Sequence, residues 1–225
     1  MHPPLHSSRP VWFVWSGIVL VGLLAHARPS AAKECPRIIG RNPAAALVCR
    51  LQDPDLDVRQ RAAAALGELG ADGAPAVPTL VKALRGTHEG LRAATARALG
   101  RMGAAAIPAV PSLVAALADQ SLALRIAAAE GLGSLGPHAA TAITALRRAL
   151  SSDSEALRRA AAHALVRIGD KALPTLNELV EGRGAKPQTR RAVLEALIEP
   201  GAARRLGATA QKMVPLEESY WLSPE

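Results

Sequence analysis

The sequence predicts an all-α protein, an α-solenoid of about five helical hairpins of 33 residues each. Three observations predict this fold: marker residues recur every 33 positions, apolar residues within each unit follow helical spacing, and the composition favours helices. Of the 225 residues 49% are hydrophobic but only 2% are aromatic, so the core must consist of Ala, Leu, Val and Ile. Ala and Leu are strong helix formers, whereas a sheet would be richer in β-branched and aromatic residues.

The internal repeat has one Arg column, two apolar columns and a Gly column, each with a spacing of 33. The columns are Arg59, Arg92, Arg125, Arg158 and Arg191; Leu47, Leu80, Leu113, Leu146 and Leu179; Leu66, Leu99, Leu132, Leu165 and Ile198; and Gly70, Gly103, Gly136 and Gly169. We therefore expect five units at 43–72, 73–105, 106–138, 139–171 and 172–200. The fifth unit departs from the pattern at Arg183, Glu199 and Gly201, as expected of a capping unit.

Each unit is predicted to contain two helices. In the first unit Leu47, Val48 and Leu51 mark the first helix, and a polar turn, 53–55, supplies an Asp that can cap the second. The apolar stripe of the second helix is Val58, Ala62, Ala65, Leu66 and Leu69. The Gly column ends each second helix, and prolines such as Pro78 and Pro111 lie where the next helix begins.

The first 32 residues have the pattern of a secretory signal peptide. Arg9 precedes an apolar run over 11–25, and Ser30-Ala31-Ala32 meets the small-x-small rule for cleavage. We expect export to the periplasm or secretion, with Lys33 as the first mature residue. Alternatively the run stays uncleaved as a membrane anchor, although it is shorter than the ~20 apolar residues of a spanning helix. The predicted organisation is 1–32 signal peptide, 33–42 N-terminal segment, 43–200 repeat solenoid and 201–225 C-terminal tail.

The two cysteines suit an oxidising compartment. Cys35 precedes the first helix and Cys49 lies within it, so a disulfide could pin the N-terminal segment to the first unit. A loop of this size contributes roughly 3 kcal/mol in the chain-entropy model. The alternative is two unrelated buried thiols.

The segment 55–70 resembles the second helix of HEAT repeats, in particular the short phycobilisome-lyase-like variety, and the same pattern returns at 91–103, 124–136 and 157–169. The resemblance covers roughly 43–200 and implies an armadillo-like scaffold for protein binding. It says little about chemistry.

Two enzymatic relatives remain as an alternative, a lyase and a metal-dependent hydroxylase. Deoxyhypusine hydroxylase, which has this repeat, carries iron-binding His-Glu pairs just after the Arg column. Those positions here are Gln60-Arg61, Ala93-Ala94, Ile126-Ala127, Arg159-Ala160 and Ala192-Val193. The single His88-Glu89 pair lies off this register, and His138 and His163 have no Cys at zinc spacing. We therefore expect no enzymatic activity, no cofactor and no metal.

The charge of +8 does not by itself indicate a nucleic-acid partner. The chain has 22 Arg but only 5 Lys, spread among acids, with no basic block and no aromatic residues between the basic ones. We expect another protein as the partner, with an acidic segment, and no nucleic acid. Contact with a membrane is expected only if the N-terminal segment stays uncleaved.

The candidate binding residues lie on second helices, facing away from the core on the predicted concave side. They are Arg61, Arg97, Arg101, Arg159, His163 and Arg167. Such a strip can bind carboxylates through Arg, although ordinary solvated helix faces would look the same. The Arg column itself is predicted to be structural, as the resemblance implies, pairing with Asp53, Asp119 or Asp153 of a neighbouring turn. In the tail, Tyr220 and Trp221 are expected to anchor the chain end on the last unit, or to enter a partner pocket.

Overall fold

The computed structural model describes residues 43–182, 185–199, 201–202 and 206. The predicted signal peptide, Cys35, Tyr220 and Trp221 lie outside these residues. Within them the regular structure is helical throughout. The α-helices are α1 (Pro43–Arg50), α2 (Leu56–Glu68), α3 (Val77–Ala83), α4 (Glu89–Arg101), α5 (Val110–Ala116), α6 (Leu122–Leu135), α7 (Ile143–Ala149), α8 (Glu155–Ile168), α9 (Leu173–Glu181) and α10 (Pro187–Ile198).

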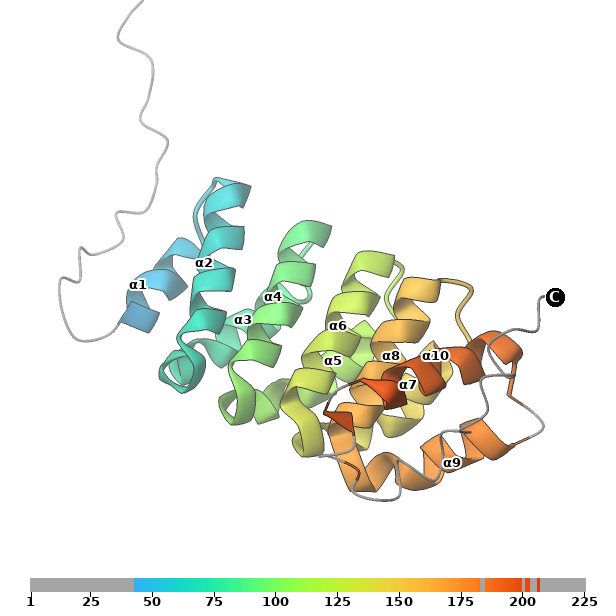
Figure 1. Ribbon diagram of the computed structural model, residues 1–225. Coiled ribbons are helices and arrows are strands. Elements are labelled where there is room, and N and C mark those ends of the chain that lie inside the picture. Colours follow the sequence, from blue (N-terminus) through green and yellow to red (C-terminus); the bar gives the residue numbers. More distant parts are fainter. Residues whose placement is uncertain (1–42, 183–184, 200, 203–205, 207–225) are drawn as a thin grey trace, which may run out of the picture. The chain divides into compact units, whose positions relative to one another are not determined.

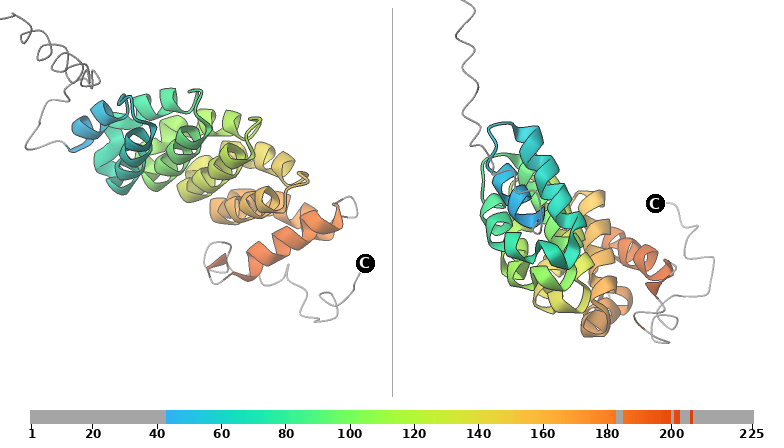
Figure 2. Two further views of the ribbon diagram at one scale, coloured as in Figure 1. Left: turned by 90° about the horizontal axis from the view of Figure 1, so that it is seen from above. Right: turned by 90° about the vertical axis from the view of Figure 1, so that its left-hand side faces the viewer.

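Consecutive α-helices pair into hairpins, and the hairpins stack. Each even-numbered helix packs on the next, from α2 to α10, and the odd-numbered helices form a second layer behind them (Figure 1; Figure 2). Short 3-10 helices connect one hairpin to the next: η1 (Gly70–Ala76), η2 (Gly103–Ala109), η3 (Gly136–Ala142) and η4 (Gly169–Ala172). This arrangement confirms the predicted all-α solenoid of helical hairpins.

The ends of the even-numbered helices follow the predicted signals. Asp55 caps α2, Ser121 caps α6 and Ser154 caps α8 through side-chain oxygens. His88 occupies the same column before α4 and makes no such bond. The glycines that close the helices have φ between 54° and 83°, a conformation that costs other residues energy.

The core contains the predicted apolar columns in the first four units, except that Leu47 of the first unit is only half-buried. Leu66, Leu99, Leu132 and Leu165 are fully buried on the even-numbered helices, and Leu80, Leu113 and Leu146 are fully buried on the odd-numbered ones. The core is continuous from one hairpin to the next, so each hairpin hides its apolar side against a neighbour.

In the fifth hairpin the predicted register is wrong. In the first helix Leu176 is the fully buried residue, while the predicted Leu179 is also in the core but 7% exposed. In the second helix Leu197 is buried, whereas the predicted Ile198 is 53% exposed. The cause lies in the connections, because η4 has four residues where η1, η2 and η3 have seven. Leu146 and Leu165 are 19 positions apart, but Leu176 and Leu197 are 21 apart. The two extra residues lie in α9, which has nine residues where α7 has seven, and they restore part of the shift.

Small residues let the even-numbered helices approach closely. A Cβ on Gly100 would lie 2.6 Å from the Cα of Gly131, and one on Gly67 would lie 2.8 Å from the Cα of Ala98. In α8 the position equivalent to Gly67, Gly100 and Gly133 is occupied by Val166. There α10 packs on α8 less extensively and is turned from the direction that α2, α4, α6 and α8 share (Figure 1).

None of the helices in the described residues is both long enough and apolar enough to span a bilayer.

Candidate functional site

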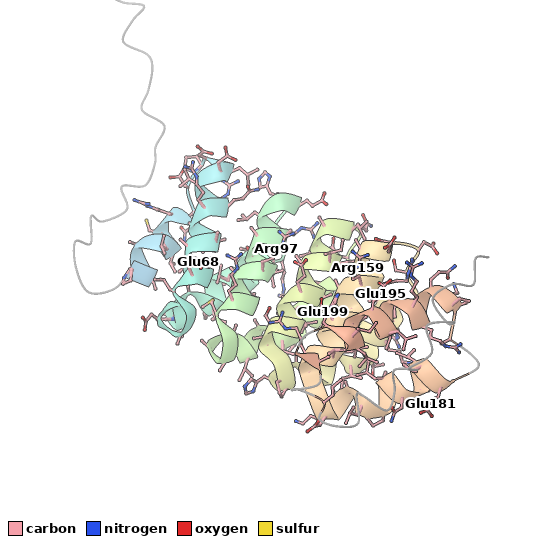
Figure 3. The ribbon with its side chains drawn as sticks, viewed as in Figure 1. Glu68, Arg97, Arg159, Glu181, Glu195 and Glu199 are labelled. Atoms are coloured by element: carbon pink, nitrogen blue, oxygen red, sulfur yellow. The ribbon has the colours of Figure 1, made fainter. Side chains whose placement is uncertain are left out.

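The predicted binding residues lie along the solvent-facing side of α2, α4 and α8. Five of them are exposed, and His163 is half-buried. Arg97 and Arg159, together with Glu68, Glu195 and Glu199, appear on the face of the even-numbered helices in Figure 3. We call this surface, formed by the exposed side chains of α2, α4, α6, α8 and α10, the second-helix face.

Two arginines and His163 of the second-helix face contact acids of a neighbouring hairpin. Arg101 on α4 forms an ion pair with Glu68 on α2. Arg97 lies 3.2 Å from Glu130 on α6, and both side chains are about half exposed (48% and 49%). His163 Nδ1 lies 3.3 Å from Glu199 at the end of α10. Exposed pairs of this kind contribute little to stability, with a median of about 0–1 kcal/mol.

Arg61 and Arg159 are also satisfied within their own helices. Arg61 donates from Nε to the Asp57 carbonyl at 3.2 Å, and Arg159 lies 2.8 Å from the Glu155 carboxylate. The expected basic strip is therefore largely neutralised, because the acids that the sequence places between the arginines are their direct partners.

Arg167 differs from the other five candidates. Its side chain is exposed and forms neither a hydrogen bond nor an ion pair with any described residue. It lines a pocket of about 600 Å³ beneath the ends of α6 and α8, together with Ser134, His138, Asp170 and Lys171. We call this the Arg167 pocket. It gathers basic side chains of two consecutive hairpins around one acid.

His138 and Lys171 were missed from the sequence, although a signal was present. They are 33 positions apart and share one repeat column, two residues after the closing glycine. Ser134 and Arg167 share another. A comparison of columns near the glycine turn would have placed all four side chains at one edge.

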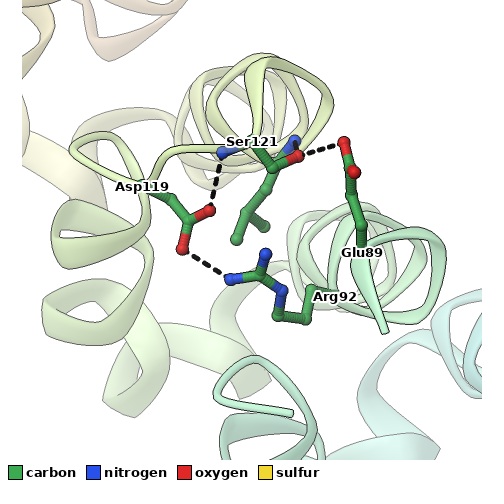
Figure 4. Close-up of polar contacts among 5 residues, drawn as sticks. Glu89, Arg92, Asp119 and Ser121 are labelled. Carbon is green, nitrogen blue, oxygen red and sulfur yellow. Dashed lines mark hydrogen bonds and ion pairs between the residues drawn. The ribbon is translucent and has the colours of Figure 1, made fainter. Parts of the chain in front are cut away.

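The Arg column is structural, and one member bridges two hairpins as predicted. Arg92 Nη1 lies 2.5 Å from Asp119 in the turn before α6 (Figure 4). Asp119 also accepts from the Ser121 amide at 2.9 Å, and Ser121 Oγ donates to Glu89 of α4. The Ser121 amide first, then Arg92, and also the charge of Arg125 hold the pKa of Asp119 below its usual value, while desolvation opposes them.

Other members of the column close their own hairpin. Arg59 donates to the carbonyls of Asp53 and Pro54 at 2.5 and 3.0 Å, and Arg158 does the same with Ser152 and Asp153 at 2.8 and 2.9 Å. These contacts satisfy carbonyls left unpaired after the first helix of the hairpin. The predicted role of Asp53 and Asp153 as carboxylate partners from a neighbouring turn is therefore wrong.

In the fifth hairpin the column residue is Arg190 and not Arg191. Arg190 donates to the Gly182 carbonyl at 2.8 Å and has a buried Nε, like Arg92, Arg125 and Arg158. Arg191 is exposed and pairs with Glu195 at 2.9 Å. The correction has the same origin as that of Leu197, the altered connections around α9.

The residues that could bear on metal chemistry are dispersed. No group of three or more His, Cys, Asp or Glu side chains suited to a metal ion occurs in the part of the chain that the structure describes. His88 lies at the start of α4, and Glu89 accepts from Ser121. Ala93 and Ala127 lie just after the Arg column, where the iron-binding alternative would require His or Glu side chains, and both are buried in the core.

Comparison with known proteins gives matches to a repeat family and to solved repeat structures. The family model for HEAT repeats matches residues 44–120 and 110–198. An engineered protein of known structure is similar with a TM-score of 0.56 and 22% identity, covering 80% of this chain and 92% of its own. The CpcE–CpcF complex of phycocyanin lyase from Nostoc sp. PCC7120 has a TM-score of 0.52 and 22% identity, covering 68% and 96%. A designed armadillo repeat protein has a TM-score of 0.50 and 17% identity, covering 77% and 93%.

These structural likenesses concern the fold, and the comparison with curated proteins gave no match. The repeat match extends over most of the chain and coincides with the stacked hairpins from α1 to α10. The chain belongs to the HEAT-repeat family.

Proposed function

We propose that this protein is a non-enzymatic scaffold that binds an acidic segment of another protein across the second-helix face. A rigid array of stacked helices presents its exposed side chains at regular intervals, which suits an extended partner. The observation that carries the proposal is the Arg167 pocket, where Arg167 has no partner among the described residues and Lys171 and His138 lie beside it.

Charge and geometry favour a carboxylate-bearing partner at this place. An Arg without an internal acceptor can form two parallel hydrogen bonds with a carboxylate at little cost in reorganisation. The paired arginines Arg97 and Arg101 would first have to leave Glu130 and Glu68. The Arg167 pocket is therefore the expected anchor, and the paired part of the face supplies weaker contacts.

A labelled ten-residue peptide of alternating Glu and Gly tests the proposal by fluorescence anisotropy. Reversing two charges in the Arg167→Glu, Lys171→Glu variant should weaken binding about tenfold or more, which corresponds to about 1.4 kcal/mol. Arg61→Glu is the matched control, because it reverses an exposed charge on α2 that is already hydrogen-bonded within its helix. Equal loss in both variants, or no binding by the unaltered protein, would contradict the proposal.

We also propose that the scaffold is exported, to the periplasm or the medium. The pattern of residues 1–32 supports this, and Cys35 with Cys49 supports a disulfide that forms after export. Cys49 lies on α1, and Cys35 lies outside the described residues. N-terminal sequencing of protein from its own cells should begin at Lys33, whereas a start at Met1 would favour the membrane-anchored alternative.

A further inference from the structure

The Arg column contains an internal comparison. Arg59, Arg158 and Arg190 donate to backbone carbonyls of their own hairpins, and Arg92 donates to a carboxylate of the next. Arg125, in the same column of α6, hydrogen-bonds through its guanidinium to none of the described residues. Its Nε is buried and has no acceptor.

One column in the hairpin turns distinguishes the surroundings of Arg92 from those of Arg125. The residue that meets Arg92 from the next turn is Asp119, and the residue 33 positions later is Ser152, which lines a pocket together with Arg125. The Ser152 hydroxyl accepts from the Ser154 amide at 3.2 Å, so it supports the local turn. Asp119, in the turn before Arg125, is close enough for the two charges to interact, but its hydrogen bonds go to Arg92 and Ser121.

A pocket lies beside Arg125, on the side where Arg92 has the Asp119 carboxylate. A pocket of about 620 Å³ lies between the third and fourth hairpins, lined by Arg125, Arg148, Ser151, Ser152 and Asp153 among others. Leu117 and Leu157 contribute apolar walls. Two guanidinium groups and serine hydroxyls around a half-apolar hollow suit a short acidic side chain better than a fully hydrated ion.

We propose that this pocket binds one carboxylate group of a partner polypeptide, with Arg125 as its principal donor. The bound group takes the position toward Arg125 that Asp119 takes toward Arg92. Asp153 in the lining disfavours a doubly charged phosphate, because its own charge would repel the second negative charge. The site lies between hairpin turns and is separate from the Arg167 pocket, so it does not depend on the function proposed above.

The test follows the side-chain Nε–H signal of Arg125 by ¹⁵N-resolved NMR, assigned with Arg125→Lys. The probes are Ac-Gly-Glu-Gly-amide for a side-chain carboxylate, Ac-Gly-Gly with a free carboxyl end for a chain terminus, Ac-Gly-Gln-Gly-amide as the neutral control, and inorganic phosphate. We expect a saturable shift with at least one carboxylate peptide, with a dissociation constant on the order of 1–10 mM. Whichever carboxylate binds identifies the kind of group that the site takes.

Ser152→Asp supplies the missing carboxylate from within, and should weaken peptide binding about tenfold or more while moving the Arg125 signal in the free protein. Ser152→Asn is the neutral comparison of matched size, and binding should weaken several-fold less than in Ser152→Asp. Absence of any carboxylate-induced shift up to about 50 mM, an equal shift with the Gln peptide, or equally tight binding of phosphate would overturn the proposal. If Ser152→Asp does not fold, the titration of the unaltered protein decides alone.

Discussion

At the residue scale, one Arg column serves two kinds of acceptor. The position puts each guanidinium beside the turn that follows the first helix of its hairpin, where carbonyl groups lack intrahelical partners. An Asp in the next turn redirects the side chain across the joint, as Asp119 does with Arg92. The repeat thus fixes where the Arg lies, and at one joint Asp119 supplies a carboxylate acceptor in place of the carbonyls.

Asp119 should make stability depend on acid pH. Its pKa is lower in the folded protein than the ordinary value near 4, so its contribution is present above about pH 4 and is lost as the pH falls through the lower folded value. Asp119→Asn should lower the free energy of unfolding at pH 7 by about 1 kcal/mol or less, since the pair is partly solvated, and should flatten the decline below pH 4. Urea unfolding from pH 7 to pH 2 measures both effects.

Asp153→Asn is the control, because the Asp153 side chain forms no hydrogen bond with any described residue. An unchanged acid slope in Asp119→Asn, or the same change in both variants, would show that the Arg92–Asp119 bridge is not the source.

At the element scale, the sequence predicted the hairpins well where the connections keep one length. Helical spacing, capping residues and closing glycines each point to the same boundaries from α2 to α8. Extending the 33-residue period into the fifth unit gave the wrong residues. Two adjacent residues of similar type are available at each position, Arg190 and Arg191 or Leu197 and Ile198, so the sequence pattern fits either alignment. Packing of α9 decides between them, and a constant period cannot show a shorter η4.

The candidate surface was only partly predictable for a related reason. Periodicity placed the six candidate residues on the correct helices and mostly exposed. Whether Arg97 faces solvent or Glu130 depends on how closely α4 and α6 approach, which the glycines of a different helix face determine.

That close approach predicts opposite effects for two Gly-to-Ala changes in α4. Gly100→Ala places a Cβ against the backbone of Gly131, which cannot move without shifting α6, so we expect a loss of about 1–3 kcal/mol. Gly90→Ala meets only the end of the flexible Gln60 side chain, and the helix propensity of Ala should make it neutral or stabilising by up to about 1 kcal/mol. Chemical denaturation compares the two. A Gly100→Ala variant as stable as Gly90→Ala would mean that α4 and α6 are farther apart than described.

At the scale of the whole array, stability depends on joints between neighbours. Each hairpin packs mainly on the next, and the packing of α4 on α6 and of α6 on α8 is the most extensive. The joint of α8 with α10 is smaller, since Val166 replaces the glycine that elsewhere brings two helices together. In a linear array the free energy of local opening follows the number and quality of such joints.

Native-state hydrogen exchange should therefore rank the helices. Amides of α4, α6 and α8 should be the most protected, and those of α10 should exchange earlier, with opening free energies lower by about 1–3 kcal/mol, because α10 can detach after losing one small joint. Val166→Gly offers a check: it permits closer approach but removes a buried side chain and lowers helix propensity, so α8 and α10 should both lose protection while α4 keeps its own. Uniform protection from α2 to α10, unaffected by position, would instead show that the hairpins unfold as one cooperative unit.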